Sequence, residues 1–467
     1  MLPLAPELDR IVRDLDSAGF RPLIVGGALR DALLGLEPKD IDMEVYGITY
    51  DRLAELLSRY GRVDPVGKSF GVVKLDGHDF SVPRRDSKTG AGHRDFLSTF
   101  DPAITPREAA SRRDFTINAM AYDPVSHEVL DFFGGREDLK NRVLRATSAA
   151  FSEDPLRVLR GMQFACRFDL TVAPETAAMS RSIANQYPTI AKERIAEEFM
   201  KWATKADHPG RIGEYLAQTG WMIHFPELER IYGVPQDPEW HPEGDVGVHT
   251  MLVVDEAARI ARRDHCEGDD RAVLLFAALT HDFAKADTTE LRERDGCLRW
   301  TSWGHEAASG PVARRFLNRI GIKSAIADQV APLVENHLVH SSIGMDVTPR
   351  AVRRLAVRLA PASITQLIRL IEADASGRPP RAKGLPDSAE RIREVAASQS
   401  VAEKPQAPLI QGRHVLPYFE NRPGKHIGEV TRAAYEAQSD NAFSDEQQAL
   451  AWLDAYMRQR SPDQETI

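Results

Sequence analysis

Hydrophobic side chains recur at helical spacing near the start of the chain, at positions Leu8, Ile11, Val12 and Leu15. Four short runs of apolar and β-branched residues follow, and such runs are typical of strands. They cover residues 23–27, 41–47, 71–75 and 79–83. From about residue 146 onward the pattern is helical, with no comparable strand. The sequence therefore predicts an α+β head with a small mixed β-sheet, followed by a long all-α region.

The length of 467 residues predicts about two to four structural units. Proline and glycine are concentrated between residues 376 and 410, which indicates a linker. From about residue 411 the helical pattern resumes and predicts a small tail. Residues 461–467 are expected to be disordered.

Composition excludes several classes of protein. No apolar run approaches the ~20 residues that a membrane-spanning helix needs, and the first residues lack the pattern of a signal peptide. The three cysteines form no CxxC pair, as expected for a protein of the reducing cytoplasm. The formal net charge is −9, so any surface that binds nucleic acid would have to be a local basic patch.

A pair of glycines and a pair of aspartates give the first candidate chemistry. Gly26 and Gly27 end a predicted strand before a helix that carries Arg30, and glycine lets the backbone approach a ligand closely. Asp40 and Asp42 follow, and residues two apart on a strand point to the same face. Two neighbouring carboxylates repel each other unless a divalent cation such as Mg²⁺ neutralises them. The segment therefore favours a magnesium site that also binds nucleotide phosphates.

Further polar residues lie on the later predicted strands and their loops. Asp79 is a third carboxylate that would complete the metal site or act as a base for a primer hydroxyl. Arg113 can hold triphosphate oxygens through two parallel hydrogen bonds, and Asn118 can bond a ribose hydroxyl. Residues 84–96 are rich in glycine and basic side chains, which predicts a mobile loop near phosphates.

Histidines and aspartates of the second half form another constellation, which matches the H…HD…D pattern of HD-type phosphohydrolases. Its members are His249, His281, Asp282, His305, His337 and Asp374. Imidazole and carboxylate ligands suit transition metals such as Mn²⁺, Ni²⁺ or Zn²⁺. A metal held there would polarise a phosphoryl oxygen and lower the pKa of a bound water. Lys285 follows the HD pair by one turn and is a candidate phosphate contact.

Five segments of the first 200 residues resemble the successive motifs of class II tRNA nucleotidyltransferases, the bacterial CCA-adding enzymes. They are VGGALRDALLG, KDIDMEVYG, RRDFTINAMAYD, DFFGGREDLKNRVLR and EDPLRVLRGMQFACRF. The resemblance implies a nucleotidyltransferase head and then a helical neck, an HD-type body and a tail. We place these parts at residues 1–145, 146–225, 226–390 and 391–467, with a linker at the start of the last part.

The same resemblance implies roles for single residues. Asp40 and Asp42 would carry Mg²⁺, and Asp79 matches an acidic residue on the next strand. The incoming ATP or CTP would be bound by Gly27, Arg30, Arg113, Arg157 and Arg160. The implied partner is tRNA, and residues 84–96 match the flexible loop that the family associates with addition of the terminal A.

Asp154 and Arg157 lie three residues apart at the start of a predicted helix, and so on one face. A carboxylate accepts from an exocyclic amine and a guanidinium donates to ring acceptors, which suits cytosine and adenine. Uracil and guanine present an N–H where an acceptor is needed. The pair therefore predicts selection of C and A by protein side chains, and in the resembling family it serves as an amino-acid template.

Resemblance of the second half implies activity as a 2′,3′-cyclic phosphodiesterase, 2′-nucleotidase or phosphatase. One departure from the pattern is Ala284, where glycine is common. Three other readings stay open: a poly(A) polymerase, a non-catalytic RNA-binding protein, and an HD phosphohydrolase whose head senses nucleotides. We expect no membrane association and a monomer or homodimer.

Overall fold

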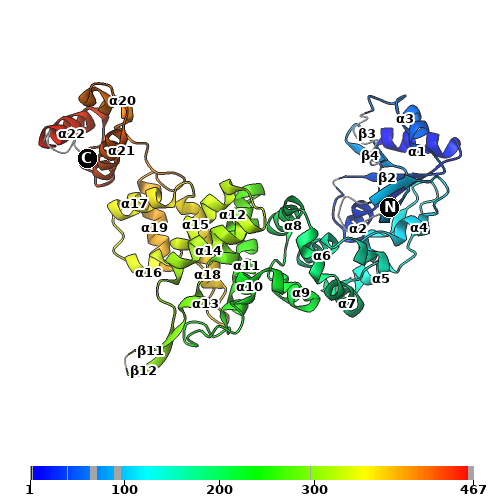
Figure 1. Ribbon diagram of the computed structural model, residues 1–467, viewed down its shortest axis with the longest axis horizontal. Helices are drawn as coiled ribbons and strands as arrows, with labels where there is room; N and C mark the ends of the chain where they lie inside the picture. Colours follow the sequence, from blue (N-terminus) through cyan, green and yellow to red (C-terminus); the bar gives the residue numbers. More distant parts are fainter. Residues whose placement is uncertain are drawn as a thin grey trace. The chain divides into compact units, whose positions relative to one another are not determined.

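The computed structural model describes residues 2, 4–38, 40–63, 71–88, 96–294 and 296–460, and side chains within 85–99 are not described. The chain forms two compact units, which meet in the sequence at Glu229 and Arg230 (Figure 1). Each unit is described by itself. In the described part of the chain, no helix has both the length and the apolar character that crossing a membrane requires.

A six-stranded sheet forms the centre of the first unit. Its strand order is β3-β4-β2-β1-β7-β8, and only the pairing of β2 with β4 is parallel among those described. The strands are β1 (Arg21–Val25), β2 (Asp42–Tyr46), β3 (Val72–Leu75), β4 (His78–Ser81), β7 (Ala121–Tyr122) and β8 (Val129–Leu130). This confirms the mixed sheet that the sequence predicts, with ends shifted by one or two residues.

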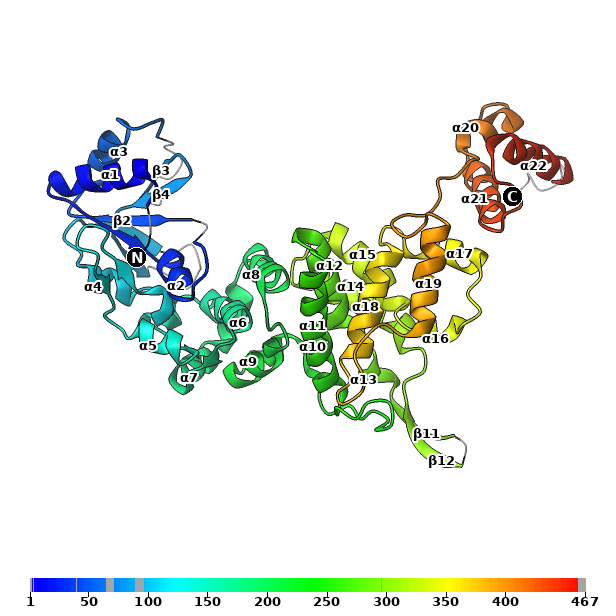
Figure 2. The same ribbon diagram turned by 180° about the vertical axis from the view of Figure 1, so that it is seen from behind.

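Helices α1 (Pro6–Ser17), α2 (Gly27–Leu33) and α3 (Tyr50–Leu57) accompany the sheet. Figure 2 shows α1 and α3 on one side of β2 and α2 on the other. The predicted apolar face of α1 is buried at Leu8, Ile11, Val12 and Leu15. The sheet supplies the other part of the core through Leu23, Ile24, Met43, Val45 and Phe80.

The polar stretch 84–96 is not a plain loop, which corrects the expectation. Its first residues form β5 (Arg84–Lys88), which pairs antiparallel with β6 (Phe96–Phe100). A two-stranded ladder is held by backbone hydrogen bonds, so the polar side chains of one strand did not prevent pairing with the apolar and β-branched FLSTF segment. Residues 89–95, the rest of the predicted loop, lie outside the described residues.

Short elements and helices complete the first unit. They are α4 (Pro106–Ser111), η2 (Thr116–Asn118), α5 (Gly135–Lys140), β9 (Val143–Leu144), η3 (Ala149–Glu153), α6 (Leu156–Phe168), β10 (Thr171–Val172), α7 (Pro174–Ser182), η4 (Ala184–Thr189), α8 (Lys192–Lys205), α9 (Arg211–Thr219), η5 (Met222–His224) and α10 (Pro226–Glu229). Helix α6 packs against both α8 and α9. Trp202 and Trp221 are fully buried among these helices.

The second unit is a helical body around α12 (Gly268–Thr280), whose residues from Ala272 to Thr280 are all buried. Around it lie α11 (Val246–Arg263), α13 (Lys285–Thr288), α14 (His305–Arg319), α15 (Ser324–Glu335), α16 (Val339–Ile343), α17 (Pro349–Leu359) and α18 (Ile364–Ser376). A helix that is apolar all round has to be central, because no face of it suits water.

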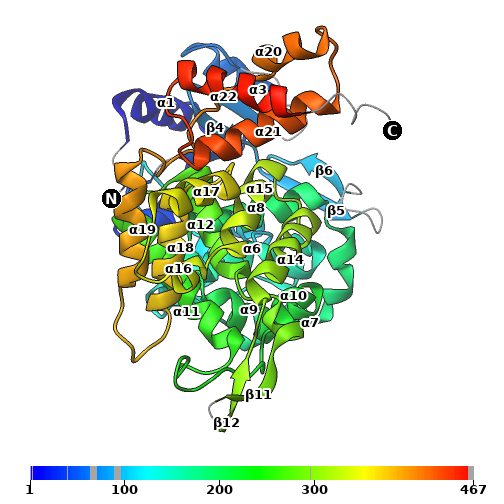
Figure 3. The same ribbon diagram turned by 90° about the vertical axis from the view of Figure 1, so that its left-hand side faces the viewer.

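One hairpin contradicts the expectation that no strand follows residue 146. Strands β11 (Glu290–Arg294) and β12 (Cys297–Thr301) pair antiparallel and project from the helices of this unit (Figures 1 and 3). Most of the hairpin side chains are exposed, so there is no alternation of buried and exposed positions for the sequence to reveal. Two short strands, β9 and β10, also pair in the neck region.

The predicted linker between residues 376 and 410 contains a packed helix, which corrects that prediction. Helix α19 (Asp387–Ser398) buries Ala389, Ile392 and Ala396, whose three- and four-residue spacing is helical. The proline-rich segments only flank it. The tail then forms α20 (Gly412–Val415), η6 (Leu416–Phe419), α21 (Lys425–Ser439) and α22 (Glu446–Gln459) around a small core of its own. Residues 461–467 lie outside the described residues.

Gly161 of α6 provides a test of this packing. A Cβ atom there would lie 2.1 Å from the Tyr215 hydroxyl and 2.9 Å from the Phe115 ring, and Tyr215 already donates to the Val158 carbonyl at 2.9 Å. Gly161→Ala should therefore lower the free energy of unfolding by about 1–3 kcal/mol, measured by thermal or urea unfolding. Gly428→Ala in α21, where nothing lies within 4 Å, is the control and should be neutral or stabilising. Equal stability of the two variants would contradict the packing.

Candidate active sites

Three carboxylates lie near one another at the first residues of the neighbouring strands β2 and β4 in the first unit. The parallel register of β2 and β4 places Asp42 beside Asp79, and the exposed Asp40 lies two residues before the start of β2. Partial burial raises the pKa of Asp42 above its usual value, and the charges of Asp79 and Asp40 raise it further. Lys74 offsets part of the negative charge, with its Nζ atom 3.1 Å from Asp79 Oδ1. A cluster of this charge fits a divalent cation.

The glycine pair lies directly beneath two arginines. Gly26 has a φ of 73°, and a Cβ atom on it would lie 3.4 Å from Arg113 Nη1. A Cβ atom on Gly27 would lie 3.3 Å from Arg30 Nη2. Glycine therefore lets both guanidinium groups approach the backbone at the end of β1. Glu44, which the sequence analysis missed, lies two residues after Asp42 and is 3.5 Å from Arg113 Nη2.

Arg30 is buried in a network rather than presented freely to a ligand. Its Nη1 atom donates to Asn118 at 2.6 Å, and its Nη2 atom donates to Asp31 at 2.6 Å. The guanidinium also lies over the rings of Phe168 and Phe164, at 4.6 and 5.2 Å. Burial lowers the pKa of Arg30. Three hydrogen bonds from its five N–H donors hold Arg30 in place, so it orders the site as well as lining the cavity.

Asp114 is the buried centre of this network, and the sequence analysis gave it no role. One oxygen accepts from the Phe115 N–H at 2.8 Å and from Asn118 Nδ2 at 3.0 Å, and the other accepts from Arg160 Nε at 2.8 Å. Burial would raise the pKa of Asp114, but Arg160 and these hydrogen bonds outweigh it, so the pKa lies below its usual value. The aspartate therefore ties the sheet-side residues to helix α6.

Asp154 and Arg157 lie at the start of α6, and the backbone fixes both. Asp154 Oδ1 accepts from the N–H of Leu156, the first residue of α6, at 3.0 Å, although Pro155 occupies the N-cap position. Arg157 donates to the carbonyls of Ala150 and Arg112, both at 2.7 Å. The other Asp154 oxygen lies 3.3 Å from Arg194 of α8, a residue that the sequence did not single out.

A cavity of about 530 Å³ collects most of these side chains. Nine predicted residues line it: Gly26, Gly27, Arg30, Asp42, Arg113, Asn118, Asp154, Arg157 and Arg160. Asp40 and Asp79 are not among the lining residues, although they adjoin Asp42. Arginines and lysines outnumber carboxylates in the described lining, which suits a polyanionic ligand such as a triphosphate. Arg112 and Arg167, which belong to clusters of arginines in the sequence, also line it, and Asp114, Arg194, Lys201 and Lys205 are lining residues that sequence reasoning missed.

All six predicted residues of the second constellation meet in the second unit. His249 Nε2 lies 3.0 Å from Asp374 Oδ1, and His281 Nε2 lies 3.1 Å from Asp282 Oδ2. Asp282 Oδ1 is 3.1 Å from His305 Nε2 and 3.9 Å from His337 Nε2. Five helical segments converge to make the cluster, because these residues lie on α11, at the ends of α12 and α15, at the start of α14 and on α18.

Backbone carbonyls fix the orientation of three of these imidazoles. The Nδ1 atoms of His281, His305 and His337 lie 2.8, 2.6 and 2.7 Å from the carbonyl oxygens of the residues three positions earlier. Each ring therefore donates through Nδ1 and presents Nε2 to the cluster. Burial lowers the pKa of His337 to about 3, which keeps the ring neutral.

Several buried atoms of this cluster make close contacts of about 3 Å with one another or with Lys285, but no hydrogen bond of good geometry among the described residues. They are His281 Nε2, His305 Nε2 and both carboxylate oxygens of Asp282. Orphaned polar atoms of this kind are costly unless a ligand satisfies them. Neutral imidazoles and ionised carboxylates are the donor set of a transition metal, so the residues fit a bound divalent cation. Lys285 and Arg378 add positive charge, at 2.8 Å from Asp282 and 2.6 Å from Asp374.

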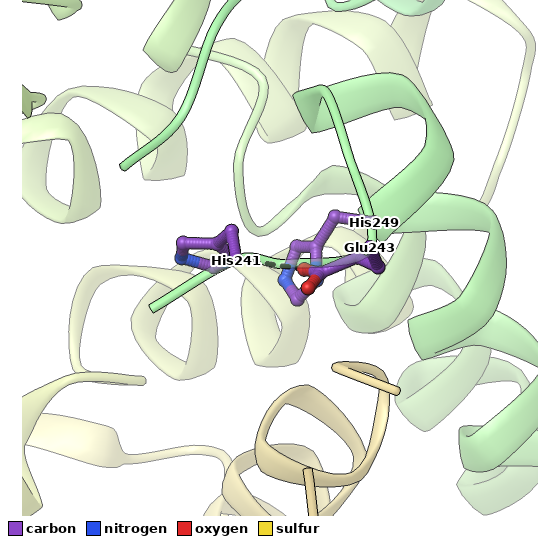
Figure 4. A group of neighbouring side chains, drawn as sticks. All are labelled: His241, Glu243 and His249. Carbon is purple, nitrogen blue, oxygen red and sulfur yellow. Dashed lines mark hydrogen bonds and ion pairs between the residues drawn. The ribbon is translucent and has the colours of Figure 1, made fainter. Parts of the chain in front are cut away.

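Glu243 orients the ring of His249 from behind. Its Oε1 atom lies 2.8 Å from His249 Nδ1 and 2.8 Å from His241 Nδ1, and Figure 4 shows the carboxylate facing both imidazoles. The two histidines lower the pKa of Glu243 to about 2 against the opposing effect of burial, so it stays ionised. Sequence reasoning missed Glu243 and His241 because both precede the helix that carries His249.

Comparison with known proteins finds a family match in each half of the chain. The "Poly A polymerase head domain" family matches residues 23–145, and the "HD domain" family matches residues 246–373. The multifunctional CCA protein of Actinobacillus pleuropneumoniae is 36% identical over 367 residues, which cover 76% of this chain and 85% of that protein. The multifunctional CCA protein of Xanthomonas campestris is 37% identical over 368 residues, with coverage of 76% and 85%.

A solved structure extends the similarity of fold to nearly the whole chain. The CCA-adding enzyme of Bacillus stearothermophilus in complex with CTP has a TM-score of 0.64 and 19% identity, and covers 98% of this chain and 99% of that chain. The extent and identity of the sequence matches decide the family. The chain belongs to the bacterial CCA-adding tRNA nucleotidyltransferases of the multifunctional CCA protein type, which join a poly(A) polymerase-type head to an HD domain.

Proposed function

We propose that the chain adds CCA to the 3′ end of tRNA from CTP and ATP, with release of pyrophosphate, and that its HD site hydrolyses phosphate esters. One observation carries the first part: Asp42, Arg113 and Asp154 line the same cavity. Residues that suit a metal, a triphosphate and a base are thus within reach of one nucleotide. We assign the catalytic carboxylates to the head, residues 1–145, and the reading of the base to the neck, residues 146–225.

The carboxylates Asp40, Asp42 and Asp79 would hold Mg²⁺, which supplies charge neutralisation at the reacting phosphate and hydroxyl oxygens when it is bound. Arg113 lies above Gly26 at the edge of the cavity and is placed to grip triphosphate oxygens. Asn118 is already bonded to Arg30 and Asp114. We therefore expect it to hold Arg30 in place rather than to bond a ribose hydroxyl.

Base selection follows from two side chains that cannot move freely. Arg157 keeps its two terminal nitrogens on backbone carbonyls, and Asp154 is held by a backbone N–H and by Arg194. The carboxylate accepts from the exocyclic amine of cytosine or adenine, and the guanidinium donates to a ring acceptor. A base with an N–H at that acceptor position leaves buried polar groups unpaired, at about 1–3 kcal/mol each.

In the HD site, His249, His281, Asp282, His305, His337 and Asp374 would hold Mn²⁺, Ni²⁺ or Zn²⁺. The ion supplies a Lewis acid for the phosphoryl oxygen when it is bound. Lys285 and Arg378 line the adjoining cavity and are placed to bind phosphate oxygens. The reaction would be that of a 2′,3′-cyclic phosphodiesterase, 2′-nucleotidase or phosphatase.

The relatives' names favour CCA addition over the poly(A) polymerase reading.

Base selection is tested by primer extension on tRNA ending at position 73, 74 or 75, with each nucleoside triphosphate supplied alone. The native chain should add C, C and A. Asp154→Asn keeps the helix cap but places a donor where an acceptor is needed, so discrimination against UTP and GTP should fall by about 10- to 100-fold. Glu214→Ala, an exposed change in the same unit away from the cavity, should change nothing. Unaltered selectivity in Asp154→Asn would rule out the template role.

Reciprocal variants separate the two proposed activities. Asp282→Asn removes a charge that the HD metal needs, and should reduce hydrolysis of p-nitrophenyl phosphate by more than about 100-fold with no effect on CCA addition. Asp42→Asn should do the reverse. The alternative in which the head senses nucleotides predicts another result. The native chain would then add no CCA, and Asp42→Asn would lose hydrolysis in a nucleotide-dependent way.

The role of Glu243 is tested by metal binding rather than by activity. Glu243→Gln removes the charge that faces His249 Nδ1, so the affinity for Mn²⁺ or Ni²⁺ should fall by about 10- to 100-fold, measured by calorimetry. Glu293→Gln, an exposed carboxylate of β11 that does not line this cavity, serves as the control and should bind metal within about threefold of the native chain. Equal affinity in both variants would show that Glu243 does not position the ligand.

A further inference from the structure

The cavity over the HD site has an aromatic wall that metal binding does not explain. It measures about 500 Å³, and besides the metal-site residues it is lined by Trp240, Trp300 and Trp303. These tryptophans are 51%, 38% and 66% exposed. Of the six tryptophans in the chain, three therefore lie around one cavity, with their rings accessible to water. Exposed aromatic rings that gather at a cavity mark a binding surface.

The wall is built from two segments that are tied together. Trp300 lies on β12 and Trp303 follows it, whereas Trp240 lies in the loop before α11. Arg299 joins them, with Nη1 at 3.3 Å from Asp237 and 2.5 Å from Glu239. The hairpin is therefore held against the loop rather than extended freely into solvent.

Arginines flank the same rings. The guanidinium of Arg292 lies 4.6 Å from the Trp303 ring centre, and that of Arg381 lies 4.9 Å from the Trp240 ring centre. Arg294 of β11 also lines the cavity. Alternating tryptophan and arginine side chains suit a planar base together with its phosphates, because the ring stacks and the cation attracts the anion.

The aromatic wall is directly connected to the metal site. His305 Nδ1 lies 2.6 Å from the Ser302 carbonyl oxygen, so the segment with Trp300 and Trp303 also orients a predicted metal ligand. Lys285 and Arg378 line the same cavity and lie beside Asp282 and Asp374. A ligand in the cavity would thus find basic side chains for its phosphate and aromatic rings for its base.

We propose that Trp240, Trp300 and Trp303 form a stacking wall for the base of a nucleotide whose phosphate ester is presented to the HD site. This inference rests on the proposed phosphohydrolase function and identifies the residues that would bind the base of its nucleotide substrate. Stacking does not read base edges, so we expect purine and pyrimidine nucleotides to be accepted alike. The nucleotide is either free or the 3′-terminal residue of an RNA, since both present the same base and phosphate.

The test compares esters of secondary alcohols that differ in the base. The substrates are adenosine 2′-phosphate, an oligoribonucleotide with a terminal 2′-phosphate, and glycerol 2-phosphate, which has no base. Trp303→Ala and Trp300→Ala should each raise KM for the two nucleotide substrates by about 5- to 100-fold. KM and kcat for glycerol 2-phosphate should stay within about twofold. A preference for the oligonucleotide over the mononucleotide would identify RNA as the source.

Two controls make the result specific to stacking. Trp303→Phe keeps an aromatic face and should recover most of the affinity. Leu298→Ala alters an exposed apolar side chain of the same hairpin that does not line the cavity. It should leave KM unchanged for all three substrates. An equal loss of kcat/KM on all three substrates would contradict the stacking role and show that the tryptophans only support the metal site.

Binding is measured separately from hydrolysis. Adenosine 2′-phosphate should quench the tryptophan fluorescence of the full chain in the presence of a chelator, and Trp303→Ala should lose most of that quenching whereas Leu298→Ala should not. If the native chain hydrolyses none of the esters, the proposed phosphohydrolase function is wrong, and the quenching still tests whether the tryptophans bind the base. If the esters are hydrolysed without any quenching, and the alanine variants have native KM values, the stacking role is wrong and the phosphohydrolase function stands.

Discussion

The buried carboxylate of Asp114 is the constraint on which the first site depends. It accepts from Arg160 on α6 and from Asn118, which in turn accepts from Arg30 on α2. Removing one partner of a buried, bonded charge pair costs about 3–5 kcal/mol, because the other charge is left unpaired. The glycine turn at the end of β1, helix α2 and helix α6 are thereby held in fixed positions relative to one another, which a site of several cooperating side chains requires.

The HD site solves a different problem with similar chemistry. A group of imidazoles and carboxylates lies at the centre of a helical body, where burial opposes every charge. Backbone carbonyls accept from Nδ1 of His281, His305 and His337, and Glu243 faces Nδ1 of His241 and His249. The Nε2 atoms of His249, His281, His305 and His337 therefore face Asp282 or Asp374. The carbonyls lie within single helical turns, so the fold itself sets the ligand geometry.

The sequence predicted those residues whose chemistry is visible in a short motif. The pairing of Asp42 with Asp79 follows from two strands, and the six HD residues follow from their spacing and from the family pattern. Asp114 and Arg194 could not be recognised, because their partners Arg160 and Asp154 lie 46 and 40 residues away in the sequence. Glu243 was missed because it lies in the loop before the helix that carries His249. The hairpin β11–β12 was missed for another reason: solvent on both sides leaves no periodic pattern. Helix α19 was hidden by the prolines on either side of it.

The attachment of Arg157 has a consequence for how one pocket serves two bases. Its terminal nitrogens are bonded to main-chain oxygens from two separate stretches, at Ala150 and Arg112. Swinging this side chain alone would break both bonds, so it behaves as an extension of the polypeptide scaffold. If Arg157 contacts the base as proposed, exchange of a one-ring for a two-ring base would have to be accommodated by the main chain at Ala150 and Arg112, or by the position of the nucleotide, rather than by a new rotamer of this side chain.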